Sequence, residues 1–582
     1  MKKTIIALCT LIILVLQACS SSSFTESESN DNFKNAQEIS VNSTVKGNFK
    51  SKDDTDYFKL DLKNKKPGNE LIKITLSGIR GISCRISIYN EKTKLILSAA
   101  DFFVNQKETI ANFKPEKQIY YIKVSIEKIK GRLNFPSNDY ILKISTYSKS
   151  KIEHEPNNNF NQAQDITKYK KITGYFSPFF SSVFNRNIYK SLKTYVEKTK
   201  NREVNLSKLM KYDIDIYKIR LPEQEKYNAS IILSSSENVN VVLFLLNNTG
   251  EVIELRNNHG FGSGEGISNL TLMGGKTYYV VVAGYERTIN FNPLNDTYTL
   301  EYKTSTFASD QETEPNNNRF TATSIVSATT KGYLSPVKDQ DWYKLTITPV
   351  LMRAMDKNYT GYLNNKNATQ VGQRPDMIMT VKLKSIPKID LMFEITDEYG
   401  QLLKKVDSLK AGEQETMINF NVSFGKIYYI VVKGAPSNIK ESFKKQYELN
   451  ISFRDKMQNE EAEPNDIKTM NINPANQVKV GGGINGYMSP ANDVDYIYVT
   501  INIPGKYLVE VTGVPGIKFR IDVYDPEDFS IGVGVSKKEG KAASLKKIIS
   551  STGIHYIVIR NISAKKKFND KTRYFLSVKK LE

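Results

Sequence analysis

The sequence has few of the residue types from which catalytic centres are most often built. Among 582 residues there are three histidines, three cysteines and one tryptophan. His154, His259 and His555 are far apart, and none has a second histidine at metal-binding spacing, which excludes a zinc site of the His-Glu-x-x-His kind. The glycine-rich stretch 260–264 has the spacing of neither a phosphate-binding loop nor a nucleophile elbow. These absences favour a protein that is not an enzyme.

Long apolar runs are also scarce, and the one at residues 4–16 is too short to span a bilayer comfortably. It follows a basic start and has the proportions of a secretory signal. It ends in Leu16-Gln17-Ala18-Cys19, which resembles the lipobox of bacterial lipoproteins. The resemblance implies cleavage after Ala18 and a lipid on the Cys19 thiol. We therefore expect a signal peptide at 1–18, a short lipidated tether at 19–25, and a membrane attachment through the lipid alone.

The cysteines leave no internal disulfide to form. Cys9 departs with the signal peptide and Cys19 takes the lipid, so only Cys84 remains. Cys84 lies in an alternating strand pattern, which predicts a small buried hydrophobic residue.

Acidic residues are outnumbered by basic ones. The formal charge of +20 falls to about +18 without Lys2 and Lys3, in a chain with 25% charged residues. A basic exported protein favours anionic polysaccharide, lipid headgroups or an acidic protein surface. The alternative is that the lysines only keep the surface soluble. Behind a lipoprotein signal we expect no nucleic-acid partner.

What the chain does contain is one pattern repeated four times. An acidic phrase and a later Asp-x-Asp phrase recur in the same order. Between them stands a strand led by glycine, at Gly47, Gly174, Gly332 and Gly486. A strand with paired aromatic residues and a closing strand that begins with tyrosine follow. The residues of the two phrases are Glu26, Glu28, Asn30, Asp31 with Asp54, Asp56; Glu153, Glu155, Asn157, Asn158 with Asp213, Asp215; Glu312, Glu314, Asn316, Asn317 with Asp339, Asp341; and Glu461, Glu463, Asn465, Asp466 with Asp493, Asp495.

The shared segments are short, β-branched and aromatic, and they are separated by turn residues. Many short strands at this spacing predict an all-β chain of tandem sandwiches, each long enough to bury its own core. The expected divisions are repeat 1 (26–148), repeat 2 (149–306), repeat 3 (307–455) and repeat 4 (456–582).

The phrases Glu-x-Glu-Pro-Asn-Asn and Asp-x-Asp-(Trp/Tyr), with the paired-aromatic strand, resemble the bacterial pre-peptidase C-terminal domain. The resemblance covers the mature chain as four copies. It is strongest in repeat 3 and weaker in repeat 1, where Ser29 replaces the proline. It implies a jelly-roll-like β-sandwich. Such domains usually follow secreted proteases, and in clostridial collagenases related domains bind collagen and calcium; no protease domain accompanies them here.

The acidic phrases are candidate calcium sites. Calcium takes six to eight oxygen ligands. In an extended segment residues i, i+2 and i+4 face the same way, so Glu153, Glu155 and Asn157 would present three oxygens together, as would Asp213 and Asp215. The collagenase resemblance implies the same set, position by position, in all four copies. The alternative is that these residues only close turns or are solvated.

Two insertions distinguish the copies. Residues 179–211 in repeat 2 are basic, and their apolar residues at helical spacing predict a short amphipathic helix. Such a helix would cover the sandwich, or bind a membrane or an anionic partner. Residues 350–377 in repeat 3 are expected to form a long polar loop.

These observations predict a lipid-anchored outer-membrane protein that faces the periplasm or the cell surface. We expect a non-catalytic, adhesin-like protein whose modules bind polysaccharide or a matrix protein, anionic ligands among them. The alternative is a periplasmic scaffold or an accessory subunit of an envelope enzyme complex.

Overall fold

The computed structural model describes residues 22–63, 70–100, 103–148, 150–176, 186–199, 204–205, 209, 213–223, 226–288, 290–292, 295–306, 308–355, 377–436, 441–469, 473–490, 493–563 and 568–581. The expected signal peptide and the lipidation site Cys19 lie outside these residues. None of the described helices is long and apolar enough to cross a membrane.

The chain is nearly all β, with 55% strand and 4% helix, which confirms the predicted class. It divides into two compact units, one of Met1–Pro222, Ile232–Glu265 and Gly275–Tyr302, the other of Glu223–Ile231, Gly266–Gly274 and Lys303–Glu582. The strands form eight sheets, two for each repeat. The division into four domains stays a prediction, and the repeat names are kept for the residue ranges given above.

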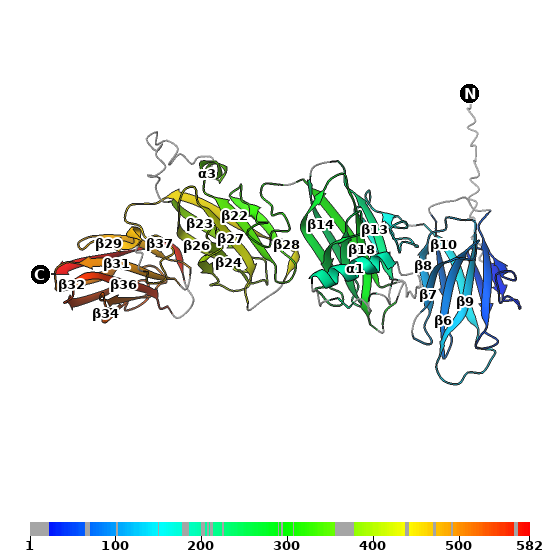
Figure 1. Cartoon of the computed structure of the whole chain (residues 1–582). Coiled ribbons are helices and arrows are strands. Elements are labelled where there is room, and N and C mark those ends of the chain that lie inside the picture. The colour runs from blue at the N-terminus through cyan, green and yellow to red at the C-terminus, as the bar shows by residue number, and fades with distance from the viewer. Residues whose placement is uncertain are drawn as a thin grey trace, which may run out of the picture. The chain divides into compact units, whose positions relative to one another are not determined.

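In repeat 1 the sheets have the strand orders β1-β3-β10-β5-β8 and β2-β4-β9-β6-β7 (Figure 1). The strands are β1 (Ser22–Thr25), β2 (Gln37–Ile39), β3 (Ser43–Gly47), β4 (Thr55–Asp61), β5 (Leu71–Leu76), β6 (Ile82–Asn90), β7 (Leu95–Ala100), β8 (Glu108–Phe113), β9 (Ile119–Ile129) and β10 (Tyr140–Tyr147). Cys84 is buried in β6 as predicted, and burial raises the pKa of its thiol to about 12.

In repeat 2 the orders are β12-β19-β14-β17 and β11-β13-β18-β15-β16. The elements are β11 (Gln164–Asp165), β12 (Lys171–Tyr175), α1 (Arg186–Thr199), β13 (Ile214–Arg220), β14 (Lys226–Ser235), β15 (Val239–Leu246), β16 (Val252–Arg256), β17 (Glu265–Met273), β18 (Thr277–Arg287) and β19 (Thr297–Ser305).

Repeat 3 has the orders β21-β28-β23-β26 and β20-β22-β27-β24-β25. Its elements are β20 (Thr323–Ser324), β21 (Thr329–Leu334), β22 (Gln340–Thr346), α3 (Pro349–Met355), β23 (Met377–Lys384), β24 (Leu391–Thr396), β25 (Leu402–Val406), β26 (Glu415–Val422), β27 (Ile427–Gly434) and β28 (Ser442–Asp455).

Repeat 4 has the orders β30-β37-β32-β35 and β29-β31-β36-β33-β34. Its elements are η2 (Pro474–Asn476), β29 (Gln477–Val478), β30 (Gly483–Met488), β31 (Val494–Ile501), β32 (Gly505–Val511), β33 (Phe519–Tyr524), β34 (Ser530–Val535), β35 (Ala543–Ile549), β36 (Gly553–Asn561) and β37 (Asn569–Leu581).

One pairing plan recurs in all four repeats. The short strands β2, β11, β20 and β29 pair in parallel with β4, β13, β22 and β31, the strands that carry the Asp-x-Asp phrase. Those strands pair antiparallel with the paired-aromatic strands β9, β18, β27 and β36. In repeats 1, 3 and 4 the apolar side chains of both sheets pack into one core, which makes each of these repeats sandwich-like.

Consecutive repeats are joined by backbone pairing. The segments 152–155, 311–314 and 460–463, here called the joint segments, carry the Glu-x-Glu residues. Each lies between the last edge strand of the preceding repeat and the glycine-led strand of its own. In the third, Glu463 bridges Phe420 of β26 in parallel while Glu460 bridges Asn485 of β30. The other two form the equivalent bridges.

The joint segments correct the expectation of four separate jelly-roll sandwiches. The sequence suggested polar linkers between the repeats, but the backbone groups of these residues are paired on both sides. Glu314 donates its N–H to Asn269 O at 2.9 Å, and Thr271 donates to Glu314 O at 3.0 Å. In this respect the chain resembles a β-solenoid, in which each repeat pairs with the next, more than a string of independent modules.

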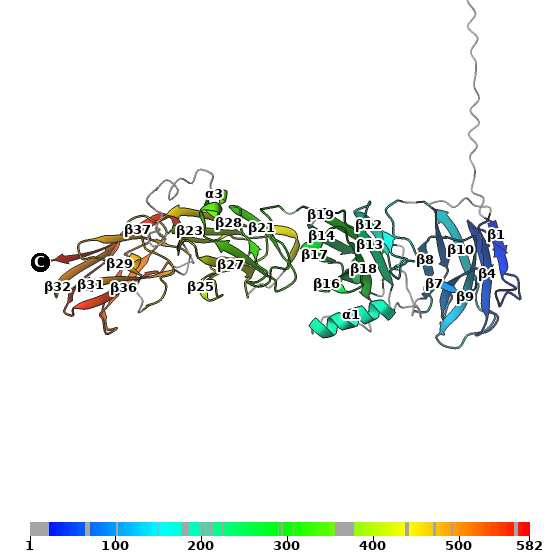
Figure 2. The same cartoon turned by 45° about the horizontal axis from the view of Figure 1, so that its top comes forward.

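The two insertions differ from each other. The predicted helix in 179–211 is present as α1, which Figure 2 shows lying along the sheet that contains β16 and β18. Its Leu192 is buried, and Tyr195 packs against the same apolar cluster. The expected polar loop at 350–377 is wrong for its first part, because residues 349–355 form α3, with Leu351 and Met352 buried in the core of repeat 3. Residues 356–376 lie outside the described part of the chain.

Replacing Leu192 by alanine tests whether α1 is held by its apolar face. We expect a loss of about 2 to 4 kcal/mol of local stability, because a buried leucine loses its contacts. Lys193→Ala is the control, since this exposed lysine makes only a 3.8 Å pair with Glu197. Hydrogen exchange of residues 186–199 should rise for Leu192→Ala and stay unchanged for the control. Equal exchange in both variants would contradict the packing of α1.

Candidate functional site

The acidic phrases of each repeat converge on one cluster. Carboxylate oxygens of four groups lie within 4.8 Å of one another: Glu28, Asp31 and Asp54; Glu153, Glu155 and Asp215; Glu312, Glu314 and Asp341; Glu463, Asp493 and Asp495. We call these acidic clusters 1 to 4 and include the asparagine and remaining acidic residues of the same phrases. In clusters 2 to 4 the glutamates come from the joint segment and the aspartates from the start of β13, β22 or β31. In cluster 1 Glu28 and Asp31 come from the acidic phrase before β2, and Asp54 directly precedes β4. Acidic side chains of the two phrases therefore lie close together in each repeat, while their role as calcium ligands stays a prediction.

Cluster 3 shows how the side chains are held. The Tyr333 N–H donates to Glu312 Oε1 at 2.5 Å, and the Tyr343 hydroxyl donates to Glu312 Oε2 at 3.0 Å. The Tyr447 hydroxyl, from the closing strand β28, donates to Asp341 Oδ2 at 2.5 Å. The backbone oxygen of Asn316 accepts from the Trp342 N–H at 2.9 Å, which ties the joint region to β22.

The closing-strand tyrosine and the leading glycine are site residues that the sequence reasoning did not assign. Tyr140, Tyr298, Tyr447 and Tyr574 each donate to the second aspartate of their cluster, at 2.5 to 2.8 Å. A Cβ on Gly332 would lie 2.3 Å from Glu312 Oε2 and 2.4 Å from the Tyr447 hydroxyl, and Gly486 has the equivalent close contacts. Their recurrence in all four copies was the available signal.

The most informative feature of the clusters is a set of buried oxygens without hydrogen-bond partners. Among the described residues, Oδ1 of the second aspartate has no partner in any repeat, at Asp56, Asp215, Asp341 and Asp495. The amide oxygens of Asn30, Asn157, Asn316 and Asn465 have none either, nor have Glu155 Oε1 and Glu463 Oε1. Leaving a buried polar atom unsatisfied costs about 1 to 3 kcal/mol, and more when it is charged. Such a set of oxygens in every repeat points to a cation.

The electrostatics agree with this. Burial, together with the neighbouring carboxylates Asp215, Glu314 and Glu463, raises the pKa of Glu155, Glu312 and Glu461 to about 8. Burial and neighbouring carboxylates also raise the pKa of Asp341 and Asp495 well above the usual range. A bound cation would favour the charged forms and reverse these shifts.

The residues fit calcium better than a transition metal. The donors are carboxylate, amide and backbone oxygens, without imidazole or thiolate among the described members of the clusters. Calcium prefers such oxygens and tolerates irregular geometry. In clusters 2 and 3 the residues that would hold it are Glu155, Asn157 and Asp215, and Glu312, Asn316 and Asp341. Cluster 4 also contains the Lys404 ammonium.

The predicted ligands are not all equally placed. In cluster 1 Glu28 and Asp31 are exposed, whereas Asp56 and Asn30 are buried. Asn158 reaches its cluster by donating to Glu155 Oε2 at 3.3 Å, but Asn317 is exposed. Glu26, Glu153 and Glu461 occupy the position of Glu312, each accepting a backbone N–H from the residue after the leading glycine. Asp213, Asp339 and Asp493, the first aspartates, are buried, and Asp54 nearly so.

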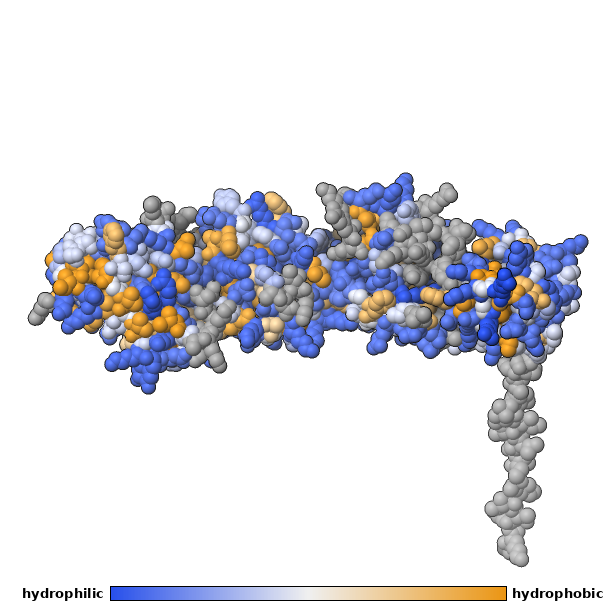
Figure 3. All heavy atoms as spheres, turned by 90° about the horizontal axis from the view of Figure 1, so that it is seen from below, coloured by the Kyte–Doolittle hydropathy of each residue, from blue (hydrophilic) through white to orange (hydrophobic). Residues whose placement is uncertain are grey.

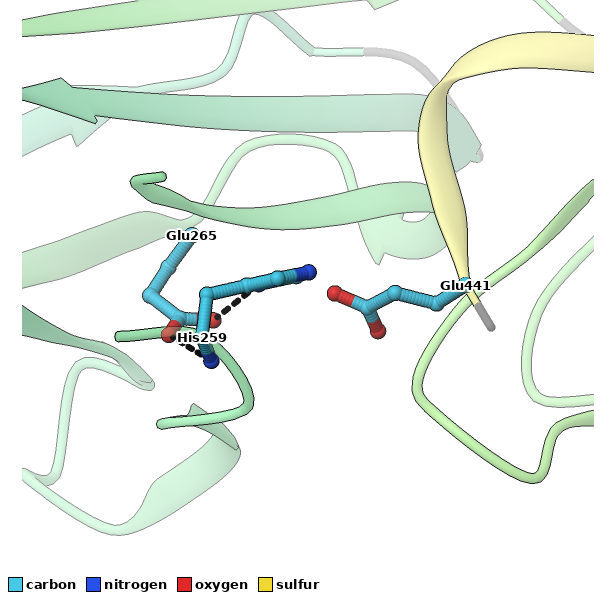
Figure 4. A group of neighbouring side chains, drawn as sticks. All are labelled: His259, Glu265 and Glu441. Atoms are coloured by element: carbon cyan, nitrogen blue, oxygen red, sulfur yellow. Dashed lines mark hydrogen bonds and ion pairs between the residues drawn. The ribbon is translucent and has the colours of Figure 1, made fainter. Parts of the chain in front are cut away.

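The three histidines serve local structure. Figure 4 shows His259 beside Glu265, whose carboxylate accepts the His259 backbone N–H at 2.9 Å and lies 3.5 Å from Nδ1. Burial lowers the pKa of His154 to about 4. His555 Nε2 lies 2.9 Å from Ser551 Oγ, and its Nδ1 lies 3.2 Å from Gly553 O, so the ring closes a turn before β36.

Comparison with known proteins identifies no family. No protein-family model and no curated protein matches the chain. Similar solved structures include the pre-peptidase C-terminal domain of a collagenase from Bacillus anthracis, at 14% identity and TM-score 0.15, covering 18% of this chain and 91% of that one. This is the domain type that the repeated phrases resemble.

Two further solved structures are similar to longer parts of the chain. The PBSX exported protein XepA has 12% identity and TM-score 0.14, covering 43% of this chain and 86% of that one. A protein from Eubacterium rectale described as secreted has 8% identity and TM-score 0.14, covering 48% and 81%. At these scores the function has to be read from the chain's own side chains.

Removing calcium and removing one ligand test the clusters together. We expect a chelator to lower the melting temperature of the mature chain, because the buried carboxylates then repel one another. Asp341→Asn should show a smaller effect of the chelator. In calcium we expect this variant to be less stable than wild type, and in chelator no less stable, because it has one buried carboxylate fewer. Asp310→Asn, which alters a half-exposed pair with Lys331 at 3.2 Å, should behave as wild type. If neither calcium removal nor Asp341→Asn changes the melting temperature, these sites are ruled out.

The raised pKa values predict a pH dependence. A carboxyl group whose folded pKa lies above its unfolded value stabilises the fold at low pH, and that stability is lost as the pH rises through the folded pKa. For Glu155, Glu312 and Glu461 the window runs from 4.5 to about 8. Without calcium the melting temperature should fall by at least about 2 °C across this window. Excess calcium should reduce the fall, and a metal-free melting temperature that rises instead would contradict the burial of these groups.

Proposed function

We propose that the chain is an exported, lipid-anchored, non-catalytic binding protein whose repeats are joined through calcium. The observation that carries this proposal is the placement of buried, unpartnered carboxylate and amide oxygens beside each joint segment. Export and outer-membrane attachment rest on the signal and on Cys19. The non-catalytic reading rests on the use of the histidines and acidic residues in local and joint structure.

Calcium would act on the joints. In cluster 3 it would connect Glu312 of the joint segment with Asp341 of β22, while the same segment is hydrogen-bonded to β17 of the preceding repeat. Such a bridge removes the electrostatic repulsion that burial imposes and holds the segment between its two partners. Repeats whose spacing is held constant engage a repetitive ligand with less loss of freedom, which raises avidity.

The ligand we propose is a polysaccharide or a matrix protein, anionic ones among them. Figure 3 shows apolar surface gathered over repeat 4, at the left of the view. Exposed apolar side chains of this repeat include Ile503, Phe529 and Ile548, at 60, 70 and 71% exposure. Contiguous apolar surface of this kind often marks an interaction site. The excess of lysine over the whole chain favours a negatively charged ligand.

The tyrosines that recur in the four closing strands do not provide a surface for contact with a ligand. Tyr140, Tyr298, Tyr447 and Tyr574 are fully buried and bonded to the acidic clusters, so they pack the repeats. This favours the apolar surface of repeat 4 over the tyrosine strands as the place where a ligand binds.

The second candidate is a periplasmic scaffold or an accessory subunit of an envelope enzyme complex. The backbone pairing between consecutive repeats favours it, because such pairing would let different repeats hold different partners apart. The two candidates differ in where the repeats face, which one experiment can decide.

Protease treatment of intact cells tests this directly. We expect the repeats to be digested while a periplasmic control protein survives, because an adhesin must face outward. Calcium should be varied in the same experiment, since we expect chelation to speed cleavage at 152–157 and 311–316. Binding of the mature chain to arrays of glycans and matrix proteins would follow, with Asp341→Asn beside wild type. If the repeats resist the protease until the envelope is broken, the adhesin proposal fails and the scaffold is favoured.

A further inference from the structure

Acidic cluster 4 contains a cation that belongs to the chain itself. Lys404 lies in β25 of repeat 3 and is only 5% exposed. Its Nζ lies 2.6 Å from Asp466 Oδ2, 3.2 Å from Glu463 Oε2 and 3.2 Å from Asp493 Oδ1. A side chain of repeat 3 therefore reaches the joint segment and the Asp-x-Asp phrase of repeat 4.

A lysine buried to this degree needs full compensation. Moving an ammonium group out of water costs several kcal/mol unless well-placed anions surround it. Although burial lowers the pKa of Lys404, the carboxylates of Glu463, Asp493 and Asp466 raise it above its usual value. The ammonium is therefore charged and satisfies one donor direction with each carboxylate.

The contacts define two halves of the cluster. The outer half consists of Glu463 Oε2, Asp466 and Asp493 Oδ1, and Lys404 touches all three. The inner half contains Asn465 Oδ1 and Asp495 Oδ1, which have no hydrogen-bond partner among the described residues. Lys404 thus neutralises charge in the half of the cluster that lies next to repeat 3.

The other repeats supply no cation from this position. Lys404 pairs with Ile395 of β24. In repeat 1 the register places Leu97 opposite Ile88, and in repeat 2 it places Glu254 opposite Leu245. Cluster 4 also has Asp466 where clusters 2 and 3 have Asn158 and Asn317. Among the three clusters at joint segments, the extra carboxylate and the lysine occur together; cluster 1 has Asp31 at this position, but that side chain is exposed.

We propose that Lys404 replaces a metal ion in the outer half of acidic cluster 4, so that the joint between repeats 3 and 4 holds without calcium more firmly than the joints at clusters 2 and 3. The closure of the joint between repeats 3 and 4 by Lys404 is here called the lysine latch. The comparison with the other joints rests on the proposed calcium function, whereas the latch itself does not. The chain thereby combines a joint that is closed by its own side chain with joints that respond to the metal.

Hydrogen exchange of the full mature chain, in calcium and in chelator, tests the latch. Lys404→Met keeps the length of the side chain and removes the charge. In chelator we expect the amides of 460–465 to exchange at least about tenfold faster than in wild type, because the buried carboxylates of Glu463 and Asp493 and the partly exposed Asp466 lose their cation. The matched control is Lys405→Met, since the neighbouring lysine is half-exposed and pairs with Asp407 at 3.2 Å. It should exchange as wild type.

A second variant guards against misfolding of the first. Asp466→Asn removes one carboxylate that is one-third exposed, and we expect a rise of about threefold at 460–465 in chelator. In wild type, chelation should raise exchange at 152–157 and 311–316 more than at 460–465, and Lys404→Met should abolish that difference.

The outcomes separate the two proposals. If Lys404→Met and Asp466→Asn leave exchange at 460–465 unchanged in chelator, the latch is refuted whatever calcium does elsewhere. The latch is equally refuted if chelation raises exchange at 152–157 and 311–316 and raises it as strongly at wild-type 460–465. If chelation changes none of the joints but Lys404→Met still raises exchange at 460–465, the calcium proposal fails and the lysine latch stands.

Discussion

The structure depends on a short acidic segment that is forced to be extended and buried at the same time. Each joint segment is hydrogen-bonded along one side to the preceding repeat and along the other to its own repeat. Because its residues alternate in direction, Glu312 and Glu314 turn toward the same strand that presents Asp341. Backbone pairing alone would favour this arrangement, but it concentrates negative charge where water is excluded. The tyrosine hydroxyls and backbone N–H groups that point at these carboxylates offset only part of that cost.

The contrast between the first cluster and the others shows where the burial comes from. Glu28 and Asp31 are exposed, although the phrase and the Asp-x-Asp strand are both present in repeat 1. Clusters 2, 3 and 4 each receive a side-chain amide from the preceding repeat, from Asn112, Asn269 and Asn419, on the first glutamate. In cluster 1, Glu26 Oε1 has no hydrogen-bond partner among the described residues. The cluster is therefore assembled within a repeat but closed by its neighbour, which couples the chemistry of the site to the joint.

Much of the site could be read from the sequence, because its ligands sit in phrases that recur at fixed order. Period-two geometry was enough to place Glu153, Glu155 and Asn157 on one face, and the helical spacing in 179–211 was enough to find α1. The joint itself could not be read, since polar residues such as Glu460 and Asn459 look like linker residues when their backbone partners are unknown. The role of Lys404 could not be predicted either, because nothing in the sequence around it distinguishes a buried lysine from an exposed one. The helix α3 was missed for a similar reason: Leu351 and Met352 are buried by a core that other strands build.

The four clusters are not equivalent, and the differences run along the chain. Cluster 1 is partly open to solvent through Glu28 and Asp31, so water can screen some of its charges and a cation would gain less by binding there. Clusters 2 and 3 are enclosed and hold unpartnered oxygens, so a divalent ion gains most there. Cluster 4 is enclosed too, but part of its charge is already met by Lys404. If the proposed calcium sites are correct, the same fold compensates its buried charge in three ways: by solvent, by a bound ion and by a side chain of the preceding repeat. On the proposed calcium function, burial is what makes an ion favourable, and a repeat could dispense with the ion only if another cation took its place; the pairing of Lys404 with Asp466 has the geometry of that replacement.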